Sequence, residues 1–117
     1  MWRSERGSIV TDTGEVEAML SVTPEVPGLG VARDYGRGLW TVTHLDSGMV
    51  ASWYDTQAHA MDGLLSMDGL DWTLPAADVV TGAGYVAAVV EARALPGNMD
   101  GEEIRVPKVA NVTVAKQ

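Results

Sequence analysis

Two histidines are the side chains of this sequence best suited to acid–base or metal chemistry, because imidazole titrates near neutral pH and binds transition metals. His44 falls in a segment with β-strand alternation, and Asp46 lies two residues further, on the same face of such a strand. His59 falls near Asp55 in a segment with helical periodicity. The sequence contains no His-x-x-x-His pair and no third ligand at a suitable spacing. We therefore interpret His44 as a hydrogen-bonded residue beside Trp40 and His59 as a surface residue, and we expect neither a metal nor a cofactor.

A serine on the same hairpin raises the question of nucleophilic catalysis. Ser47, His44 and Asp46 are the three residue types of a serine hydrolase relay. We do not expect this relay, because residues so close together on one hairpin cannot reach the required geometry. Cysteine is absent, which excludes a cysteine nucleophile, a disulfide framework and thiolate ligands for zinc.

The triplet Asp12-Thr13-Gly14 resembles the signature of the retroviral-type aspartic proteases. Enzymes of that family use two carboxylates that share a proton, and a homodimer of a short chain would supply both. The sequence departs from the family at Glu15, which adds a charge where a small residue is expected, and no later apolar-apolar-Gly segment follows. Asp-x-Gly is also a favoured hairpin turn. We therefore predict that Asp12 is a turn residue and that Gly14 has a positive φ, with the homodimeric protease as an alternative.

The charge pattern provides a third candidate site. The chain of 117 residues has 16 acidic and 8 basic residues, a net charge of −8 that disfavours binding to nucleic-acid phosphates or anionic membranes. The stretch from residue 46 to residue 91 contains seven acidic residues and neither Lys nor Arg. Two pairs of aspartates in it are each seven residues apart, so that helices would align each pair on one face. We predict an acidic face that binds a basic protein partner, with a merely solvated surface as the alternative. Its residues are Asp46, Asp55, Asp62, Asp71 and Asp78.

The residues around these motifs predict two hairpins. Residues 8–11 and 15–22 form the first hairpin, and residues 39–44 and 49–54 form the second around a turn at 46–48. In the first hairpin, alternate residues form an apolar face, namely Val16, Ala18, Leu20 and Val22. This period of two is typical of strands with one face against a core.

Two helices are predicted after the second hairpin. Asp55 is placed as the N-cap of the first helix, and apolar residues over 58–65 recur at spacings of three and four. Gly82 and Gly84 interrupt the next pattern. Residues 85–95 are apolar nearly all round, which fits a buried helix or a central strand, and their alanine content favours the helix.

The fold class predicted from these elements is α+β. A C-terminal extended segment over 104–114 contains Pro107, which makes it an edge strand. The N-terminal, central and C-terminal segments then form an antiparallel sheet of hairpins, with the two helices packed on one face. We expect the whole chain, residues 1–117, to be a single domain.

The tryptophans are predicted to build the core rather than a ligand platform. The chain has no phenylalanine, so tryptophan must supply much of the large apolar area. Base stacking would also require nearby Lys or Arg, which this stretch lacks. The predicted contiguous core consists of Trp40, Val42, Trp53, Leu64 and Trp72.

A longer pattern covers residues 39–73. It reads Trp40-x-Val42-Thr43-His44-x-x-Ser47-Gly48, then Thr56-x-x-x-Ala60-x-x-x-Leu64, then Asp71-Trp72-Thr73. This pattern resembles a hairpin–helix module of small uncharacterised proteins from actinobacterial phages, prophages and plasmids. The resemblance implies a phage source and no particular activity, and both flanks of the chain lie outside it.

We expect from these observations a non-enzymatic phage accessory protein that binds a host or phage protein through the acidic face in the host cytoplasm. The alternatives are a virion structural or assembly protein and the homodimeric aspartic protease. A homo-oligomer is compatible with each. The start of the chain is polar and no apolar run is long enough for a bilayer, so we expect no membrane contact.

Overall fold

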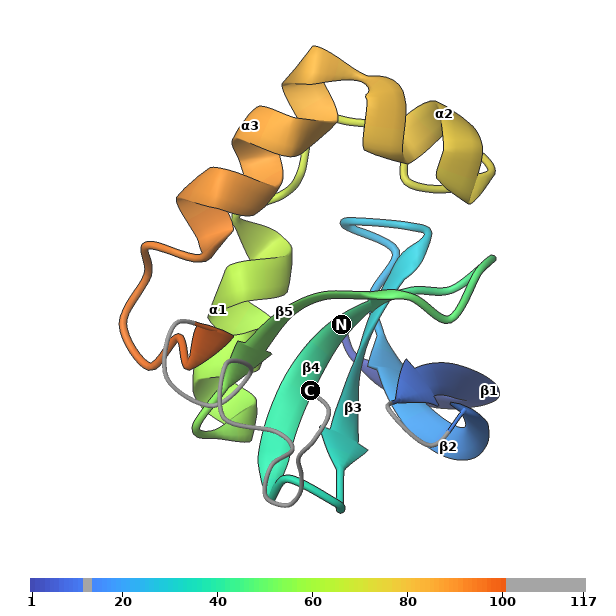
Figure 1. Ribbon diagram of the computed structural model, residues 1–117, viewed down its shortest axis with the longest axis vertical. Helices are drawn as coiled ribbons and strands as arrows, with labels where there is room; N and C mark the ends of the chain where they lie inside the picture. Colours follow the sequence, from blue (N-terminus) through green and yellow to red (C-terminus); the bar gives the residue numbers. More distant parts are fainter. Residues whose placement is uncertain (12–13, 101–117) are drawn as a thin grey trace, which may run out of the picture.

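The computed structural model describes residues 1–11 and 14–100 as one five-stranded antiparallel sheet followed by three helices (Figure 1). The strands, in sheet order, are β1 (Arg3–Thr11), β2 (Gly14–Val22), β3 (Leu29–Asp34), β4 (Leu39–His44) and β5 (Val50–Tyr54). The helices are α1 (Gln57–Leu65), α2 (Ala76–Thr81) and α3 (Ala83–Ala92). The predicted α+β class with an antiparallel sheet is confirmed, with three helices instead of two.

The N-terminal hairpin joins β1 and β2 along their whole length. The paired residues run from Arg3 with Val22 to Thr11 with Gly14. Gly14 has a φ of 112°, as predicted, a conformation that glycine adopts without the steric penalty of a side chain. Asp12, the residue of the turn and protease hypotheses, lies outside the described residues.

The hairpin then turns away from the rest of the sheet (Figure 1). In the described part of the chain, β2 pairs with β3 only at Ser21 and Val31. The other end of β1 reaches the β4–β5 turn, where the Val10 N–H donates to the Gly48 carbonyl at 2.8 Å. A small buried cluster fastens the hairpin to β3 and consists of Ile9, Leu20, Val22 and Ala32. Two residues of the predicted apolar face thus meet a core.

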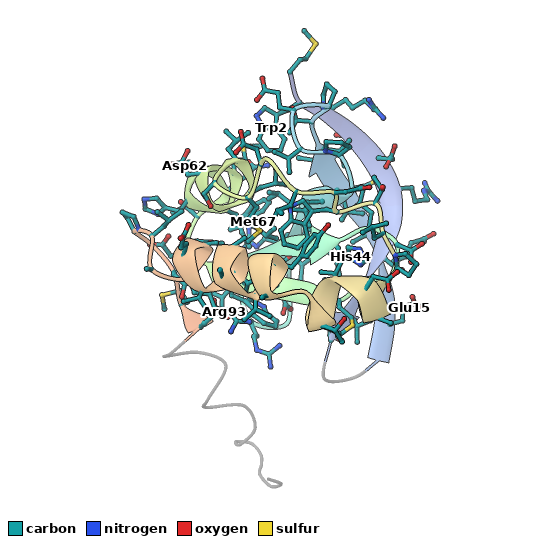
Figure 2. The ribbon with its side chains drawn as sticks, turned by 90° about the horizontal axis from the view of Figure 1, so that it is seen from above. Trp2, Glu15, His44, Asp62, Met67 and Arg93 are labelled. Atoms are coloured by element: carbon teal, nitrogen blue, oxygen red, sulfur yellow. The ribbon has the colours of Figure 1, made fainter. Side chains whose placement is uncertain are left out.

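The larger core lies between the sheet and the helices. Its buried members include Val31, Val42, Tyr54, Leu64, Met67 and Trp72, and Met67 lies between α1 and α3 (Figure 2). The fully buried Tyr54 links β5 to α3, because its hydroxyl donates to the Ala92 carbonyl at 2.8 Å. A Cβ at Gly63 would overlap the Tyr54 ring. Glycine therefore lets α1 approach β5 closely, although it costs about 1 kcal/mol of helix stability relative to alanine.

The helix boundaries correct one prediction and settle another. The N-cap of α1 is Thr56, one residue after the predicted Asp55, and its hydroxyl accepts from the His59 N–H at 3.1 Å. Gly82 has extended backbone angles and separates α2 from α3. Residues 83–92 are helical, so the ambiguous apolar stretch is a helix rather than a central strand.

The remaining predictions from the sequence concern the C-terminal strand and membrane-spanning segments. The C-terminal strand over residues 104–114 lies outside the described residues. No helix in the described ranges is both long enough and apolar enough to cross a membrane.

Candidate functional site

The five predicted core residues do not all share one environment. Val42, Leu64 and Trp72 belong to the buried cluster under the helices, and the partly buried Trp40 packs against its margin. Trp53 lies on the opposite face of β5, where its indole N–H donates to the Asp34 carboxylate at 3.2 Å. Side chains alternate along a strand, so only one of two neighbours can face the helices. That neighbour is Tyr54, which corrects the placement of Trp53 in the core.

The predicted acidic face is spread over several elements. Asp62 lies on α1 (Figure 2) and Asp78 lies in the first turn of α2, whereas Asp46 belongs to the β4–β5 turn. Asp55 and Asp71 precede helices rather than lie within them, so helical periodicity does not align the two pairs as predicted. The seven-residue spacing is therefore no argument for a common face.

Two of these aspartates already have local partners. The His59 Nδ1–H donates to the Asp55 carboxylate at 2.7 Å, and this hydrogen bond lowers the pKa of Asp55. Asp71 accepts from the N–H of Thr73 at 3.0 Å and from its hydroxyl at 2.5 Å, and these bonds lower the pKa of Asp71. Their carboxylates order the backbone at the start of α1 and before α2.

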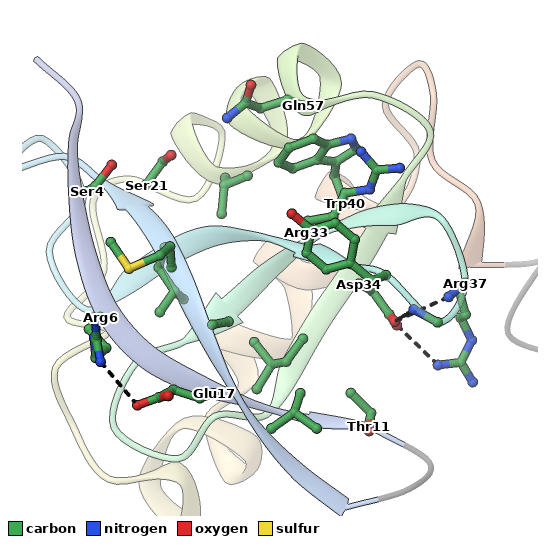
Figure 3. Close-up of a pocket in the computed structure, with 18 residues that line it drawn as sticks. Ser4, Arg6, Thr11, Glu17, Ser21, Arg33, Asp34, Arg37, Trp40 and Gln57 are labelled. Atoms are coloured by element: carbon green, nitrogen blue, oxygen red, sulfur yellow. Dashed lines mark hydrogen bonds and ion pairs between the residues drawn. The ribbon is translucent and has the colours of Figure 1, made fainter.

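A groove of about 900 Å³ lies between the β1–β2 hairpin and the β3–β4 hairpin (Figure 3). Three of the eight basic residues of this acidic chain line it, namely Arg6, Arg33 and Arg37. We call it the arginine groove. Its walls also carry polar side chains from β1, β2 and α1 and two aromatic rings, namely Ser4, Ser21, Gln57, Tyr35 and Trp40.

Asp34 organises one end of the arginine groove. Its nearly buried carboxylate accepts hydrogen bonds from the backbone N–H groups of Gly36 and Arg37 at 3.1 and 3.3 Å. It also accepts from the Arg37 guanidinium at 3.3 Å and from the Trp53 indole. The Arg37 guanidinium in turn lies 5.3 Å from the centre of the Trp53 ring. The charge of Arg37 is thus paired within the β3–β4 turn.

Arg33 lies in the same groove but, unlike Arg37, has no carboxylate partner in the described structure. Its guanidinium is held between two rings, 5.1 Å from the centre of Trp40 and 5.3 Å from the centre of Tyr35. The rings attract the cation but do not neutralise it. Within residues 1–11 and 14–100, Arg33 makes no ion pair, and its Nε is buried without a hydrogen-bond partner. A planar guanidinium stacked in this way is suited to bind a carboxylate or phosphate.

Arg6 completes the positive lining. It pairs with Glu17 at 3.7 Å, and both side chains are about three-quarters exposed. Such an exposed pair contributes about 0–1 kcal/mol. Arg6 can therefore exchange this partner for an anionic group in the groove at little loss.

The cluster of Arg33, Tyr35 and Trp40 is the site that the sequence analysis missed. Spacing along the chain does not bring Arg33 next to Trp40, because the two residues face each other across the β3–β4 pair. The signal was present in the hairpin register. A turn over residues 35–38 places residues 33 and 40 opposite each other, where side chains interact. Arg33 therefore stacks on Trp40, and Arg37 stacks on Trp53.

The structure brings Ser47 and His44 into hydrogen-bonding contact. His44 Nδ1 lies 2.8 Å from Ser47 Oγ, and Nε2 lies 2.9 Å from the Leu74 carbonyl oxygen. A carbonyl only accepts, so Nε2 carries the proton and Nδ1 accepts from the serine hydroxyl. Ser47 Oγ also accepts from the Met49 N–H at 3.1 Å, and Asp46 takes no part. The pair fastens the β4–β5 turn to the segment before α2, and His44 is hydrogen-bonded as expected.

A metal site is not apparent in the described ranges. No group of three or more His, Cys, Asp or Glu residues there has the arrangement to hold a metal ion. The two histidines are engaged with Ser47, Leu74 and Asp55, as described above.

Comparison with protein-family models, with curated proteins and with solved structures gave no match to this chain. The resemblance to actinobacterial phage proteins therefore stays a prediction. The function must be inferred from the geometry of the site.

Proposed function

We propose that this protein is a non-enzymatic protein-binding module and that the arginine groove is its binding site. The observation that carries the proposal is Arg33, whose guanidinium is stacked between two rings in an open groove, with a buried Nε that has no partner. A buried donor without an acceptor costs about 1–3 kcal/mol, and no carboxylate in the described structure pairs with this guanidinium. A ligand that brings an oxygen anion into the groove would supply the missing ion-pair partner.

The partner chemistry that fits the groove is a carboxylate on a protein segment. Arg33 supplies a fork of donors, Arg6 supplies an exchangeable charge, and Tyr35 offers a ring that is 85% exposed. Aromatic and arginine side chains are the residue types that dominate protein interfaces. The net charge of −8 repels a polyanion such as nucleic acid, which favours a partner with a few local acids.

This proposal moves the binding site away from the five aspartates of the predicted acidic face, which we call the acidic block. The predicted basic partner required several carboxylates on one face, but two of the five are engaged locally and the five lie on different elements. Solvation of the surface is sufficient to account for the acidic block. A partner bound through the arginine groove would carry acidic rather than basic side chains at the contact.

A selection from a library of random twelve-residue peptides displayed on a carrier tests the proposal. We expect the selected peptides to share an Asp or Glu, and their affinity to fall at least about tenfold for Arg33→Gln, because a charged hydrogen bond contributes about 1.5–3 kcal/mol. Arg33→Lys should recover only part of the affinity, since an ammonium lacks the planar fork. Binding should weaken as salt rises.

The matched control is Arg3→Gln. Arg3 is exposed, pairs with Glu5 and does not line the groove, so this variant makes the same change in net charge at another place. Equal losses for Arg3→Gln and Arg33→Gln would reduce the effect to net charge and contradict the proposal. Selected peptides that are basic, and that lose affinity when Asp62 and Asp78 are replaced by Lys, would return the function to the acidic block.

The expected phage source stays a prediction, as do the host cytoplasm or the virion as location and the alternative of a virion structural role. The homodimeric protease depends on Asp12, which lies outside the described residues, and no feature of the arginine groove favours it.

A further inference from the structure

One strand edge of the sheet lacks a partner where it passes the arginine groove. β2 is nine residues long and pairs with β1 over its whole length. On its other side, the described residues pair it with β3 only at Ser21. The edge from Gly14 to Leu20 therefore has no strand beside it in the described structure.

The direction of the backbone groups follows from the hairpin. The Val10 N–H donates to the Gly48 carbonyl and therefore points away from β2, so Val10 and its partner Glu15 form a non-hydrogen-bonded pair, and the direction alternates along each strand. The groups of Gly14, Val16 and Ala18 therefore face β1. The groups of Glu15, Glu17 and Met19 point the other way, in the same direction as those of Ser21, which faces β3.

This open edge forms a wall of the arginine groove. Every residue from 16 to 21 lines the groove, although their side chains alternate between the two faces of the strand. Consecutive residues with alternating side chains can all line one groove where the groove runs along the edge of their strand. Arg33 and Trp40 line the same groove from β3 and β4 (Figure 3).

At the opposite edge of the sheet, the segment that follows α3 covers β5 with hydrogen bonds. At β5, the Asp55 N–H donates to the Gly97 carbonyl, and the Met99 N–H donates to the Trp53 carbonyl. Arg93 donates to the Ala51 carbonyl at 2.8 Å. At the β2 edge, by contrast, there is neither a proline nor a covering segment in the described structure, and Met19 is 58% exposed.

We propose that the arginine groove takes an extended segment of a partner protein, which adds as a strand to the open edge of β2 and places one carboxylate against Arg33. This inference rests on the proposed function and specifies how the partner binds. The backbone of the segment would bond to Glu15, Glu17 and Met19, and its carboxylate would meet the stacked guanidinium. One acidic residue is required and not several, because Glu15 and Glu17 lie on the same strand.

The probe is a nine-residue peptide of alternating threonine and valine with a single central glutamate. Four matched controls accompany it. One carries glutamine at the centre and one carries glutamate at four positions. The other two keep the single glutamate and carry N-methyl groups on one or the other set of alternate amides. We expect the first peptide to bind at least tenfold more tightly than the glutamine and four-glutamate peptides. Methylation of the amides that face β2 should abolish binding, and methylation of the other set should be tolerated.

Amide hydrogen exchange of the complex reports the register directly. The amides of Glu15, Glu17 and Met19 should gain protection on binding, whereas those of Val16 and Ala18, which already face β1, should change little. Met19→Pro removes one outward N–H without removing a bond to β1, and it should weaken binding at least fivefold. If this variant does not fold, the methylated peptides give the same information on the native chain.

The outcomes separate the two proposals. Binding of acidic peptides that depends on Arg33, but tolerates both methylated sets and leaves β2 exchange unchanged, overturns strand addition and leaves the proposed function in place. Failure of the alternating glutamate peptide, when other acidic peptides bind, likewise overturns strand addition. Both proposals are overturned if no acidic peptide binds, or if peptides bind and Arg33→Gln leaves their affinity unchanged.

Discussion

The core under the helices and the arginine groove both contain aromatic side chains, but they differ in the hydrogen bonding of their buried polar groups. Under the helices, the Trp72 indole N–H donates to the Met67 carbonyl at 2.7 Å, and the Tyr54 hydroxyl donates to the Ala92 carbonyl. In the groove, Arg33 is stacked between rings and its buried Nε has no partner. A region whose polar groups are all matched is built for stability. A region that leaves a stacked cation unpaired is available for a ligand, at some expense of stability.

The largest expected effect is the loss of Trp72. Its side chain is 1% exposed and meets the Tyr85 ring edge to face, with the ring centres 4.9 Å apart. Trp72→Ala should lower the free energy of unfolding by about 3–5 kcal/mol, because it opens a large cavity and leaves the Met67 carbonyl without a donor. Thermal or urea unfolding measures the loss.

Trp40→Ala is the matched variant at the groove. Trp40 is only partly buried at the margin of the core, so the loss should be smaller than that of Trp72→Ala. A larger loss for Trp40→Ala would mean that the groove, and not the space under the helices, holds the fold together.

An intermediate effect is expected for Tyr54→Phe. The variant leaves the Ala92 carbonyl and the Ser52 hydroxyl, which lies 3.2 Å from the tyrosine oxygen, without this partner. The expected loss is about 1–3 kcal/mol in the free energy of unfolding. Tyr35→Phe, at a ring that is 85% exposed in the groove, should be nearly neutral.

The pH dependence of unfolding sharpens this contrast. Burial raises the pKa of Tyr54 above its ordinary value of 10.0, so the folded state holds the phenolic proton more tightly than the unfolded state. The resulting stability is fully present below pH 10 and is lost as the pH rises through the folded-state pKa. Tyr54→Phe should therefore flatten the alkaline fall in stability. An alkaline unfolding profile of Tyr54→Phe that matches that of the unsubstituted protein would contradict the assignment.

The smallest expected effect on stability is that of Arg33→Met. Arg33→Met removes the unpartnered buried Nε, which is favourable, and also the two cation–π contacts, which is unfavourable, while the methionine keeps an apolar chain against Trp40. Because these contributions oppose each other, the free energy of unfolding should change by less than about 0.5 kcal/mol. Arg37→Met is the control, since it strips the nearly buried Asp34 carboxylate of its ion pair and should be clearly destabilising. Equal losses for the two variants would give Arg33 a structural role and remove the contrast between the regions.

Local sequence patterns predicted much of the fold correctly. The period of two over residues 15–22 and the turn glycine at 14 predicted the N-terminal hairpin, and the tract over 39–54 predicted the second. Alanine content correctly favoured a helix for the apolar stretch after Gly82. Each of these predictions depends on neighbours within a few residues, where backbone preference and side-chain spacing act directly.

The errors arise where a choice depends on distant residues. Trp53 and Tyr54 are both aromatic residues suited to a core. The β4–β5 register pairs Tyr54 with Trp40, and the close approach of α1 at Gly63 leaves room for the Tyr54 ring under the helices. The hydrogen bonds of His44 to Ser47 and to the Leu74 carbonyl were likewise not predicted, because Leu74 lies 30 residues further along the chain. Neither outcome can be read from spacing along the chain.

The sequence by itself determined the α+β class, the hairpins and the acidic character of the surface, because hydrophobic period, turn chemistry and net charge are properties of short segments or of composition. The tertiary structure alone decided that Arg33 stacks on Trp40 without a carboxylate and that the β2 edge stays open along the groove. Both features depend on contacts between different segments of the chain. Arg33 meets Trp40 across the β3–β4 pair, and the packing of Leu20 and Val22 against Ala32 holds the N-terminal hairpin beside β3 where only Ser21 pairs with it, and no local preference encodes either arrangement.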